Sequence, residues 1–340
     1  MKILVTGGAG YIGSHTVVEL LNQGFDVVIL DNVANSNEIV VKRIEEITGK
    51  TPKFYKASIT DKNMLRSLFE KENIDAVIHF AALKAVGESL EKPIEYYNVN
   101  IVGTINLLDV MKEFNVKNFI FSSSATVYGT ENNVPFTEEM KASSTTASPY
   151  GYSKVVVERI LEDVCVSDKD FKAISLRYFN PVGAHESGLI GESPIGTPQN
   201  LPAIITQIAI GRIEKLMVFG DDYDTPDGTC TRDYIHIVDL ARGHIKALLK
   251  LSAIQGHEIY NLGTGKDYSV LEMISAFKSS TGVEIPYEIS ERRPNNADLP
   301  VCYALVSKAE SEIGFKAQFS IEDMWRDSWR FQQKNPNGYE

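Results

Sequence analysis

The sequence opens on a short apolar segment, Ile3 to Thr6, that runs directly into three glycines spaced three residues apart, Gly7, Gly10 and Gly13. This pattern is typical of the strand, turn and helix that begin a dinucleotide-binding βαβ unit. The first glycine allows the tight turn, the second lets the backbone approach a pyrophosphate, and the third lets the helix pack closely on the strand. The amide groups at the start of the helix then face the phosphates. Because glycines also mark ordinary loops, the interpretation depends on the strand before the turn and the helix after it.

An acidic residue after the second predicted strand supports this interpretation and indicates which cofactor fits. The strand spans Asp26 to Leu30, and Asp31 follows it. A carboxylate at this place accepts hydrogen bonds from a free ribose 2′-hydroxyl and repels a 2′-phosphate, and the nearest downstream arginine is Arg43. The sequence therefore predicts NAD rather than NADP.

The composition is that of an ordinary globular protein. The chain has 340 residues, of which 43% are hydrophobic and 23% charged, enough for one large or two modest domains. The net charge of −11 and a pI near 5.2 argue against a nucleic-acid or anionic-membrane surface, because no basic run compensates for them. We therefore expect neither nucleic acid nor a membrane as a partner.

The cysteines and the first residues bear on the cellular compartment. Cys165, Cys230 and Cys302 are too few and too scattered for a disulfide framework or a Cys-x-x-Cys metal site, so no metal is expected. The sequence goes straight into the first strand without a charged and then apolar leader. No apolar run approaches the roughly 18 residues that a membrane helix needs. These features predict a reducing, cytoplasmic location.

Strand and helix patterns alternate through the first half of the chain, which predicts an α/β fold with a Rossmann-type doubly wound parallel sheet. The segments 76–80 and 118–121 are nearly continuous apolar runs, as expected where helices cover both faces of a sheet. The predicted strands are 2–6, 26–30, 52–57, 74–80, 117–123 and 171–178.

The regular alternation ends after Asn180 and Pro181, where glycine and proline become frequent. We therefore predict an NAD-binding domain over 1–180 and a smaller α/β substrate domain over 181–340, with some later segments returning to the first domain. Because ligands of open parallel sheets bind beyond the carboxyl ends of the strands, the substrate site is expected between the two parts. The helices predicted in the second part lie near 201–211, 239–251, 270–280 and 320–333.

A tyrosine and a lysine at the start of a later helix form the candidate catalytic pair. Tyr150 and Lys154 are four residues apart, which places both on one helix face about one turn apart. A free tyrosine has a pKa of about 10, and positive charge from Lys154 and the nicotinamide of NAD⁺ would stabilise the phenolate that a base requires. Ser124 closes an apolar strand, where its hydroxyl can share a hydrogen bond with a substrate oxygen. Such a pair is usually packing and a solvated charge, but an NAD-binding turn in the same sheet favours catalysis.

Five segments together carry a resemblance that covers essentially the whole chain. They are Val5–His15, Leu83–Ser89, Phe121–Gly129, Arg177–His185 and Arg232–His236. The first is shared by many dehydrogenase-like proteins, whereas the combination is specific. It resembles the UDP-glucose 4-epimerases (UDP-galactose 4-epimerases) of the extended short-chain dehydrogenase/reductase family.

The resemblance implies three sets of site residues. Besides the three glycines, those that contact or flank NAD are Tyr11, Ile12, Asp31, Asn32, Asn35, Ser36, Ser58, Ile59, Phe80, Ala81, Ala82, Lys84, Asn100, Tyr150, Lys154 and Phe179. The catalytic set is Ser124, Tyr150 and Lys154, of which Ser124 and Tyr150 also contact substrate. Those around the uridine diphosphate are Asn180, Asn200, Leu201, Phe219, Arg232, Tyr234, Arg293 and Asp298. Arginines suit a diphosphate in an acidic protein because they supply charge-assisted hydrogen bonds.

Three departures from the family pattern bear on these assignments. Ser58 stands where many members have an aspartate that holds the adenine amino group, and Val99 precedes Asn100 where some members have a second asparagine. The run Pro294 to Asp298 is slightly longer than the usual segment.

The resemblance implies an NAD-dependent epimerase that inverts C4 of UDP-hexoses through a 4-keto intermediate, with Tyr150 removing the proton of the 4-hydroxyl. Two alternatives stay open. A nucleotide-sugar 4,6-dehydratase needs an Asp-Glu pair where this chain has Ala125 and Thr126. A non-catalytic NAD or nucleotide-sugar sensor would be indicated by the loss of catalytic residues, whereas Ser124, Tyr150 and Lys154 are all present.

The resemblance further implies a homodimer in which helices near 87–113 and 149–167 of each subunit pack as a four-helix bundle. It also places Cys302 beside the hexose, where some members carry a tyrosine and are restricted to UDP-glucose and UDP-galactose. A cysteine leaves room for a 2-acetamido group, which predicts activity on UDP-N-acetylglucosamine and UDP-N-acetylgalactosamine as well. The alternatives are that Cys302 is a small buried hydrophobe, or that the longer segment before it brings Tyr303 into the pocket.

Overall fold

The computed structural model describes residues 1–339 except 144–145, 147, 197 and 294–297. Its largest element is a seven-stranded sheet in which every neighbouring pair of strands is parallel. The strands are β1 (Lys2–Thr6), β2 (Asp26–Asp31), β3 (Lys53–Lys56), β4 (Ala76–His79), β5 (Asn118–Ser122), β6 (Lys172–Tyr178) and β10 (Gly256–Leu262). Their order, β10-β6-β5-β4-β1-β2-β3, grows outward from β1 in both directions. The predicted doubly wound α/β fold is confirmed, and its first six strands lie within two residues of the predicted bounds.

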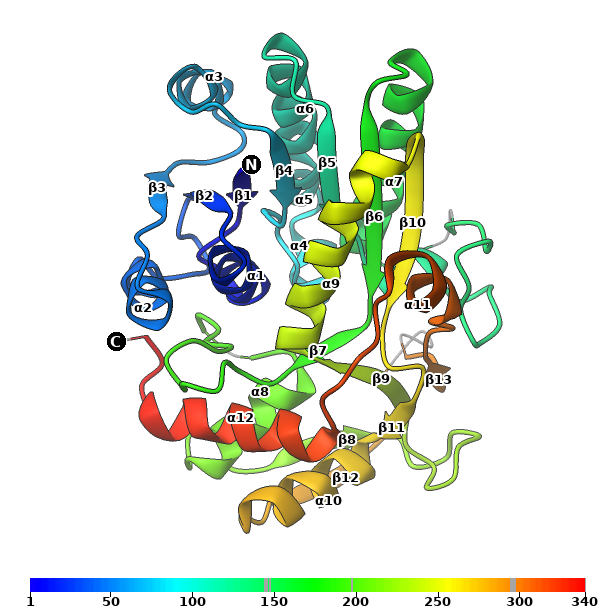
Figure 1. Cartoon of the computed structure of the whole chain (residues 1–340). Helices are drawn as coiled ribbons and strands as arrows, with labels where there is room; N and C mark the ends of the chain where they lie inside the picture. Colours follow the sequence, from blue (N-terminus) through cyan, green and yellow to red (C-terminus); the bar gives the residue numbers. More distant parts are fainter. Residues whose placement is uncertain (144–145, 147, 197, 294–297, 340) are drawn as a thin grey trace.

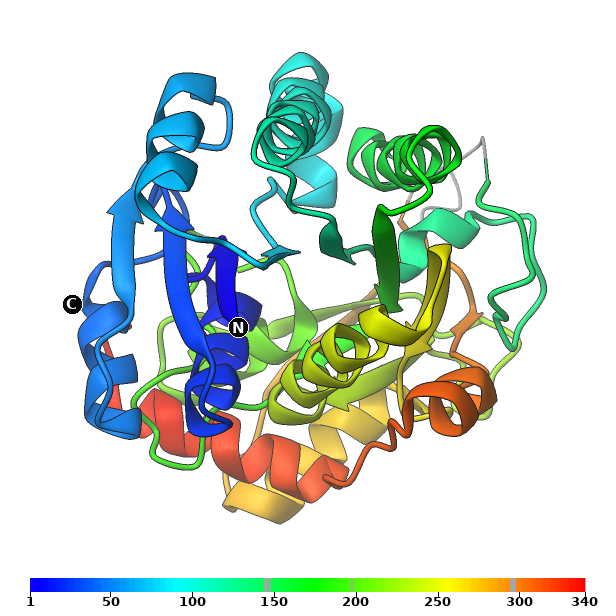
Figure 2. The same cartoon turned by 45° about the horizontal axis from the view of Figure 1, so that its top comes forward.

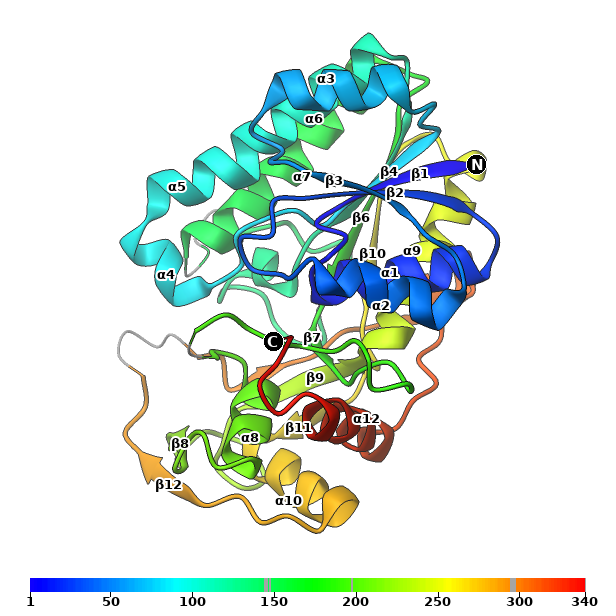
Figure 3. The same ribbon diagram turned by 90° about the vertical axis from the view of Figure 1, so that its left-hand side faces the viewer.

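Helices cover both faces of this sheet, which explains the continuous apolar strands (Figures 2 and 3). One face packs against α1 (Tyr11–Asn22), α2 (Ile39–Thr48) and α9 (Ile237–Lys250), and the other against α3 (Lys62–Lys71), α6 (Gly103–Glu113) and α7 (Pro149–Ser167). Successive side chains of β1 enter separate cores, since Ile3 and Val5 belong to one and Leu4 to the other. The strand ends are therefore held rigidly between two packed layers.

The segment predicted as one helix near 87–113 is divided in the structure. It consists of α4 (Val86–Glu91), α5 (Pro93–Tyr97), a π-helical segment η1 (Asn98–Val102) and α6. Pro93 occupies the first turn of α5, where its missing amide hydrogen is tolerated, so the helix restarts at that point. The 19 residues of α7 form one uninterrupted helix.

The chain from Asn180 onward builds two smaller sheets and, between their strands, contributes β10 to the large one (Figure 1). The strands are β7 (Asn180–Val182), β8 (Leu216–Phe219), β9 (Thr231–His236), β11 (Asp267–Ser269), β12 (Tyr287–Ser290) and β13 (Val301–Cys302). The helices are α8 (Leu201–Ala209), α10 (Val270–Thr281), α11 (Ser307–Ile313) and α12 (Ile321–Lys334), with short 3-10 turns η2 (Ala125–Tyr128) and η3 (Leu251–Ala253) elsewhere. β9 pairs with β7, β11 and β13, and β8 pairs with β12.

Two segments after 180, α9 and β10, belong to the layers of the large sheet, where β10 pairs with β6. Most of the other elements surround their own core around Trp325 and Phe277, whose rings meet edge to face at 5.1 Å, whereas α11 packs through Ala309 and Ile313 on the core of the large sheet. The division at 180 stays a prediction. Among the described residues, no helix combines the length and the apolar character that crossing a bilayer requires.

Candidate active site

The glycine turn has the geometry that its spacing predicts. Gly7 has a φ of +72°, a conformation that residues with a side chain rarely adopt. A Cβ atom on Gly7 would lie 2.8 Å from the Ala81 nitrogen, and one on Gly13 would lie 2.2 Å from the Gly7 carbonyl oxygen. A Cβ on Gly10 would approach only the Gly7 oxygen, at 3.2 Å, so its outer side is open. The backbone thus offers a cradle that larger residues would fill.

Gly10 directly precedes α1 as its N-cap residue, and among the described residues no side chain caps this helix start. The first amide groups of α1 are therefore available to an anion, as binding of a pyrophosphate requires. The Tyr11 hydroxyl donates a 2.6 Å hydrogen bond to the Gly183 carbonyl and so ties this turn to the second part of the chain.

Asp31 lies at the end of β2, almost fully buried, with its carboxylate fixed toward the turn. Its Oδ2 accepts a 3.0 Å hydrogen bond from the Ala9 amide, and its Oδ1 accepts bonds from the Val33 amide at 2.8 Å and the Ser36 hydroxyl at 3.0 Å. The neighbouring predicted residues Asn32 and Asn35 are exposed. This arrangement suits a free ribose, whose hydroxyls can donate to the remaining lone pairs of the carboxylate.

Two groups of predicted NAD residues follow β3 and β4. The Ser58 hydroxyl forms a local hydrogen bond with the Thr60 hydroxyl, at 2.8 Å. Ile59 is buried beside Gly103. The segment Phe80–Ala82 follows β4 and contacts Gly7 through the Ala81 backbone. The segment after β4 thus lies against the glycine turn. The contact of these residues with NAD stays a prediction.

Asn100 holds the next loop in place from the π-helical segment. It exchanges hydrogen bonds with the Leu83 backbone, accepting at 2.8 Å and donating at 3.0 Å, and donates to the Ser153 hydroxyl at 3.0 Å. Lys84, at the end of that loop, lies 3.4 Å from the Glu192 carboxylate. Glu192 also accepts a 2.8 Å bond from Asn200 and was not predicted as a site residue.

The catalytic set is assembled by α7 and the end of β5. α7 begins where the Ser148 hydroxyl accepts from the Gly151 amide, with Pro149 in the first turn, so Tyr150 and Lys154 lie on one face. The Lys154 ammonium donates to the Ser122 carbonyl at 2.8 Å and lies 5.8 Å from the centre of the Tyr150 ring. Ser124 shares a hydrogen bond with Tyr150. The three predicted catalytic residues therefore meet.

Burial opposes charge on both members of the pair. It raises the pKa of the Tyr150 phenol, which the hydrogen bond with Ser124 lowers in part. It lowers the pKa of Lys154 to about 7, while the negative charge of Glu158 acts in the opposite direction. The attraction of Lys154 alone thus does not make the phenol acidic, and the positive nicotinamide expected beside it has to supply part of the stabilisation.

The predicted diphosphate residues converge from several elements. Arg232 on β9 donates to the carbonyls of Thr231 and Leu299 at 2.8 and 2.7 Å. Its guanidinium lies 3.4 Å from Asp298, which also accepts from Arg293 at 3.0 Å. Two guanidinium groups thus share one carboxylate, which leaves the cluster with a net positive charge that suits binding of a diphosphate.

The remaining predicted substrate residues lie on β7, β8 and β9 and at the start of α8. Asn180 on β7 pairs in register with Tyr234 on β9, and Asn200 and Leu201 begin α8. The Arg293 guanidinium lies 4.4 Å from the centre of the Phe219 ring. The longer run predicted before Asp298 falls on Pro294–Ala297, which lie outside the described residues.

Cys302 lies in register beside Arg232 and packs with an apolar cluster that includes Phe179 and Ala125. Burial raises the pKa of its thiol to about 11, so it is protonated at neutral pH. The described contacts place Cys302, and not Tyr303, in this cluster, while the Tyr303 carbonyl accepts from the Phe136 amide. Cys302 therefore packs in the same cluster as Ala125, which directly follows Ser124.

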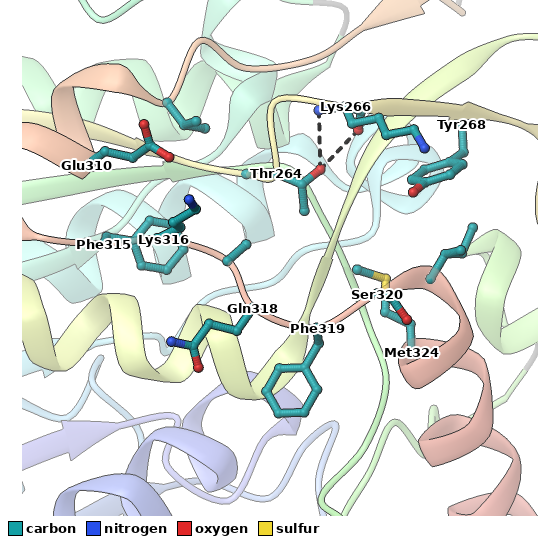
Figure 4. A pocket seen from close by; sticks show the side chains of 14 residues that line it. Thr264, Lys266, Tyr268, Glu310, Phe315, Lys316, Gln318, Phe319, Ser320 and Met324 are labelled. Carbon is teal, nitrogen blue, oxygen red and sulfur yellow. Dashed lines mark hydrogen bonds between the residues drawn. The ribbon is translucent and has the colours of Figure 1, made fainter.

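A pocket of about 270 Å³ lies elsewhere (Figure 4). It is lined by the turn after β10, by Tyr268 of β11, by the start of α11, by the segment 315–320 and by the start of α12. The described lining includes none of the predicted site residues. Its Thr264 turn is held by Asp233, which accepts from the Thr264 amide at 2.9 Å. Because side chains alternate along β9, Asp233 points away from the face that carries Arg232 and Tyr234. The pocket is therefore separate from the candidate active site.

Comparison with known proteins agrees with this geometry. The model of the NAD dependent epimerase/dehydratase family matches residues 3–263. A UDP-glucose 4-epimerase of Erwinia amylovora is 54% identical over 338 residues, with 99% of each chain covered. The crystal structure of UDP-glucose 4-epimerase from Bifidobacterium longum in complex with NAD⁺ and UDP superposes with a TM-score of 0.94 at 53% identity, covering 100% of both chains. The UDP-Glc/GlcNAc 4-epimerase of Campylobacter jejuni has a TM-score of 0.85 at 34% identity, covering 98% of this chain and 99% of its own.

Proposed function

The chain belongs to the NAD dependent epimerase/dehydratase family, and we propose that it is an NAD-dependent epimerase that interconverts UDP-glucose and UDP-galactose by inverting C4. The observation that carries the proposal is the meeting of Ser124, Tyr150 and Lys154 at the edge of the sheet that also carries the glycine turn and Asp31. The similarity to UDP-glucose 4-epimerases over the full length, one of them solved with NAD⁺ and UDP, supports both the reaction and the cofactor.

In this proposal the side chains of the catalytic set move one proton and hold the sugar. Tyr150 takes the proton of the sugar's 4-hydroxyl and later returns it, while Ser124 shares a hydrogen bond with the same oxygen. Lys154 stabilises the phenolate and is itself oriented by the Ser122 carbonyl. NAD, when bound in the glycine cradle, supplies the acceptor and donor of hydride for a 4-keto sugar.

The substrate site must hold one end of the ligand tightly and leave the other free to turn. Arg232 and Arg293 are the groups on which the diphosphate would rest, and Phe219 offers an apolar ring beside them. The hexose then turns about its diphosphate link and presents its other face to the same tyrosine.

The two alternatives are not supported. Elimination of a C6 hydroxyl, as a 4,6-dehydratase requires, needs an acid and a base next to Ser124, where this chain has Ala125 and Thr126. A sensor without activity is not expected to keep Tyr150 and Lys154 buried together, because burying two ionisable groups is costly.

Product analysis tests the function directly. The purified protein, incubated with UDP-galactose and no added NAD, is expected to form UDP-glucose until both sugars reach equilibrium. UDP-glucuronate serves as a comparison sugar whose C6 carboxylate places an added charge in the hexose site. Absence of any conversion of UDP-galactose by protein shown to contain NAD would contradict the proposed function.

Asp31 is expected to set the preference for NAD over NADP. Asp31→Asn keeps the size of the side chain but removes its charge, so NAD binding should weaken by about tenfold and the exclusion of NADP should relax, because the repulsion of a 2′-phosphate is lost. The NAD and NADP retained after gel filtration measure both effects. Unchanged NAD retention with NADP still excluded would place the specificity elsewhere, for example at Asn32 or Asn35.

The expected homodimer is supported by an exposed apolar surface on the helices implied by the resemblance. Leu90 and Ile94, on α4 and α5, are 61% and 82% exposed, and Val102 and Ile105 continue the surface at 44% and 40%. Contiguous exposed apolar residues mark interaction sites more often than isolated ones. We propose that two copies of this surface, together with α7, form a four-helix interface.

Light scattering tests this interface. The wild-type protein should have twice the chain mass of 37.8 kDa, and Ile94→Glu should shift it toward the mass of one chain, because a charge would be buried at the interface. Leu249→Glu is the matched control, since Leu249 is 55% exposed on α9, away from this surface. If Ile94→Glu kept the mass of two chains, as Leu249→Glu should, the proposal that this surface forms the dimer interface would be wrong.

A cytoplasmic location is also proposed. Cys165, Cys230 and Cys302 are unpaired thiols, two of them buried, which fits a reducing compartment.

A further inference from the structure

A buried ion pair lies directly behind the catalytic set. Glu158 and Arg177 are 5% and 2% exposed. Arg177 Nη2 donates to Glu158 Oε2 at 2.7 Å, and its Nε donates to Oε1 at 3.0 Å, which is the bidentate geometry that gives arginine–carboxylate pairs their strength. The Ser123 hydroxyl donates to the same Oε1 at 2.5 Å. One carboxylate therefore accepts from two different elements.

These contacts join the two elements that carry the catalytic residues, α7 and the end of β5, to a third element, β6. Glu158 lies one turn after Lys154 on the buried face of α7, and Arg177 comes from β6. Ser123 follows β5 and stands between Ser122, whose carbonyl accepts from Lys154, and Ser124. The carboxylate thus fixes how far the segment 122–124 lies from α7.

Stability alone is a weak explanation for this arrangement. Apolar residues of similar volume often stabilise a core as well as a buried ion pair does, because both charges lose their hydration. The pair also lies among groups whose charge matters for the reaction, since Glu158 acts on the pKa of Lys154.

On the basis of the proposed function, we propose that Glu158 and Arg177 are positioning residues for the epimerase reaction, which hold the segment 122–124 against α7 and bias the charge states of Tyr150 and Lys154 with opposite signs. They touch neither the sugar nor the cofactor in this scheme. They act through Ser123 and through their charges.

The surrounding titratable groups leave these two charges dominant. His79 of β4 and His257 of β10 face Lys154 and Glu158, respectively, and burial lowers their pKa values to about 3 and about 4, so both are neutral at pH 7. Burial raises the pKa of Tyr178 of β6, which faces Tyr150, so it stays protonated. Tyr128 of η2, whose ring centre lies 4.8 Å from the Arg177 guanidinium, also stays protonated, because burial raises its pKa to about 12. Glu158 acts on the pKa of Lys154, and Arg177 is paired with Glu158.

The sign of each effect follows from electrostatics. Removing the negative charge of Glu158 stabilises the Tyr150 phenolate and disfavours the Lys154 ammonium, so both pKa values fall. Removing the positive charge of Arg177 raises both. Turnover needs a deprotonated tyrosine and a protonated lysine, so the kcat–pH profile should move to lower pH for Glu158→Gln and to higher pH for Arg177→Met.

Steady-state kinetics on the NAD-containing enzyme test this directly. With UDP-galactose, both variants should lose about tenfold in kcat with KM within about threefold of wild type, since the contacts to UDP are untouched. Their pH profiles should shift in opposite directions by about half a unit or more. A loss without opposite shifts would reduce the pair to a structural role and overturn the proposal.

Two serine variants test the positioning role even if Glu158→Gln and Arg177→Met do not fold. Ser123→Ala leaves the ion pair intact and removes only its link to the segment 122–124, so kcat should fall about tenfold at unchanged NAD content. Thermal stability should fall only modestly, because Glu158 still accepts from Arg177. Ser175→Ala is the matched control, because Ser175 is equally buried on β6 and its hydroxyl lies 2.8 Å from the His257 ring. Its kcat should equal that of wild type.

Equal kcat for Ser123→Ala and Ser175→Ala would overturn the positioning role. Inactive wild-type enzyme would instead contradict the proposed function, so the two failures are distinguishable.

Discussion

Tyr150→Phe is expected to lower turnover of UDP-galactose by about 10²–10⁴-fold or more, the range typical of a positioned acid–base group. The variant loses only the hydroxyl that shares a hydrogen bond with Ser124, and the ring keeps its place beside Lys154. The UDP contacts through Arg232 and Arg293 are elsewhere, so KM should change little. The loss should therefore appear in kcat, measured by conversion of UDP-galactose at saturation.

Tyr152→Phe provides the matched control for this experiment. Tyr152 lies two residues further along α7 and is 39% exposed, on a different face from Tyr150. Its variant should retain full turnover. NAD content and thermal stability should be close to wild type in both. Equal turnover of Tyr150→Phe and Tyr152→Phe would remove Tyr150 from the chemistry.

Features with short sequence separation were predictable. The glycine turn, the strand before it and Asp31 lie within one βαβ unit, and their spacing alone places Gly13 against Gly7. Likewise, a separation of four residues puts Tyr150 and Lys154 on one helix face. Such local geometry follows from the periods of strands and helices, so it can be predicted from the spacing of residues in the sequence.

Contacts between distant segments were not predictable in the same way. Glu192 accepts hydrogen bonds from Lys84, which is 108 residues away in the sequence, and from Asn200, which is 8 residues away. The sequence around Glu192 shows only a glycine- and proline-rich stretch. The return of β10 to the edge of the large sheet depends on its pairing with β6, which no local pattern specifies. The break at Pro93 was readable in principle, because proline favours the first turn of a helix over its interior.

The Glu158–Arg177 pair lies between these cases. Glu158 continues the spacing of Tyr150 and Lys154 by one more turn, which is a local signal, and Arg177 begins one of the segments that carry the family resemblance. Their contact joins α7 to β6, however, so its role became visible only with the fold.

Cys302→Tyr is expected to abolish activity on UDP-N-acetylglucosamine and UDP-N-acetylgalactosamine while sparing UDP-galactose. We propose that the wild-type enzyme accepts these acetamido sugars, because the small thiol packs beside Phe179 and Ala125, next to the catalytic serine. A tyrosine would fill space that the acetamido group and the turning keto sugar both need.

The relative kcat/KM for the two sugar types measures this effect, and we expect it to change by on the order of 10²-fold or more, since steric exclusion acts on one substrate only. A larger side chain in a packed cluster also strains the protein, commonly by about 1–3 kcal/mol, so thermal unfolding must be followed in parallel. Cys302→Ser keeps the small volume and is the control that should retain both activities. Strain alone would lower both activities together, whereas exclusion lowers only the acetamido activity. A wild-type enzyme inert toward both acetamido sugars would leave Cys302 as a packing residue, because the space beside it would then have no use in selecting the substrate.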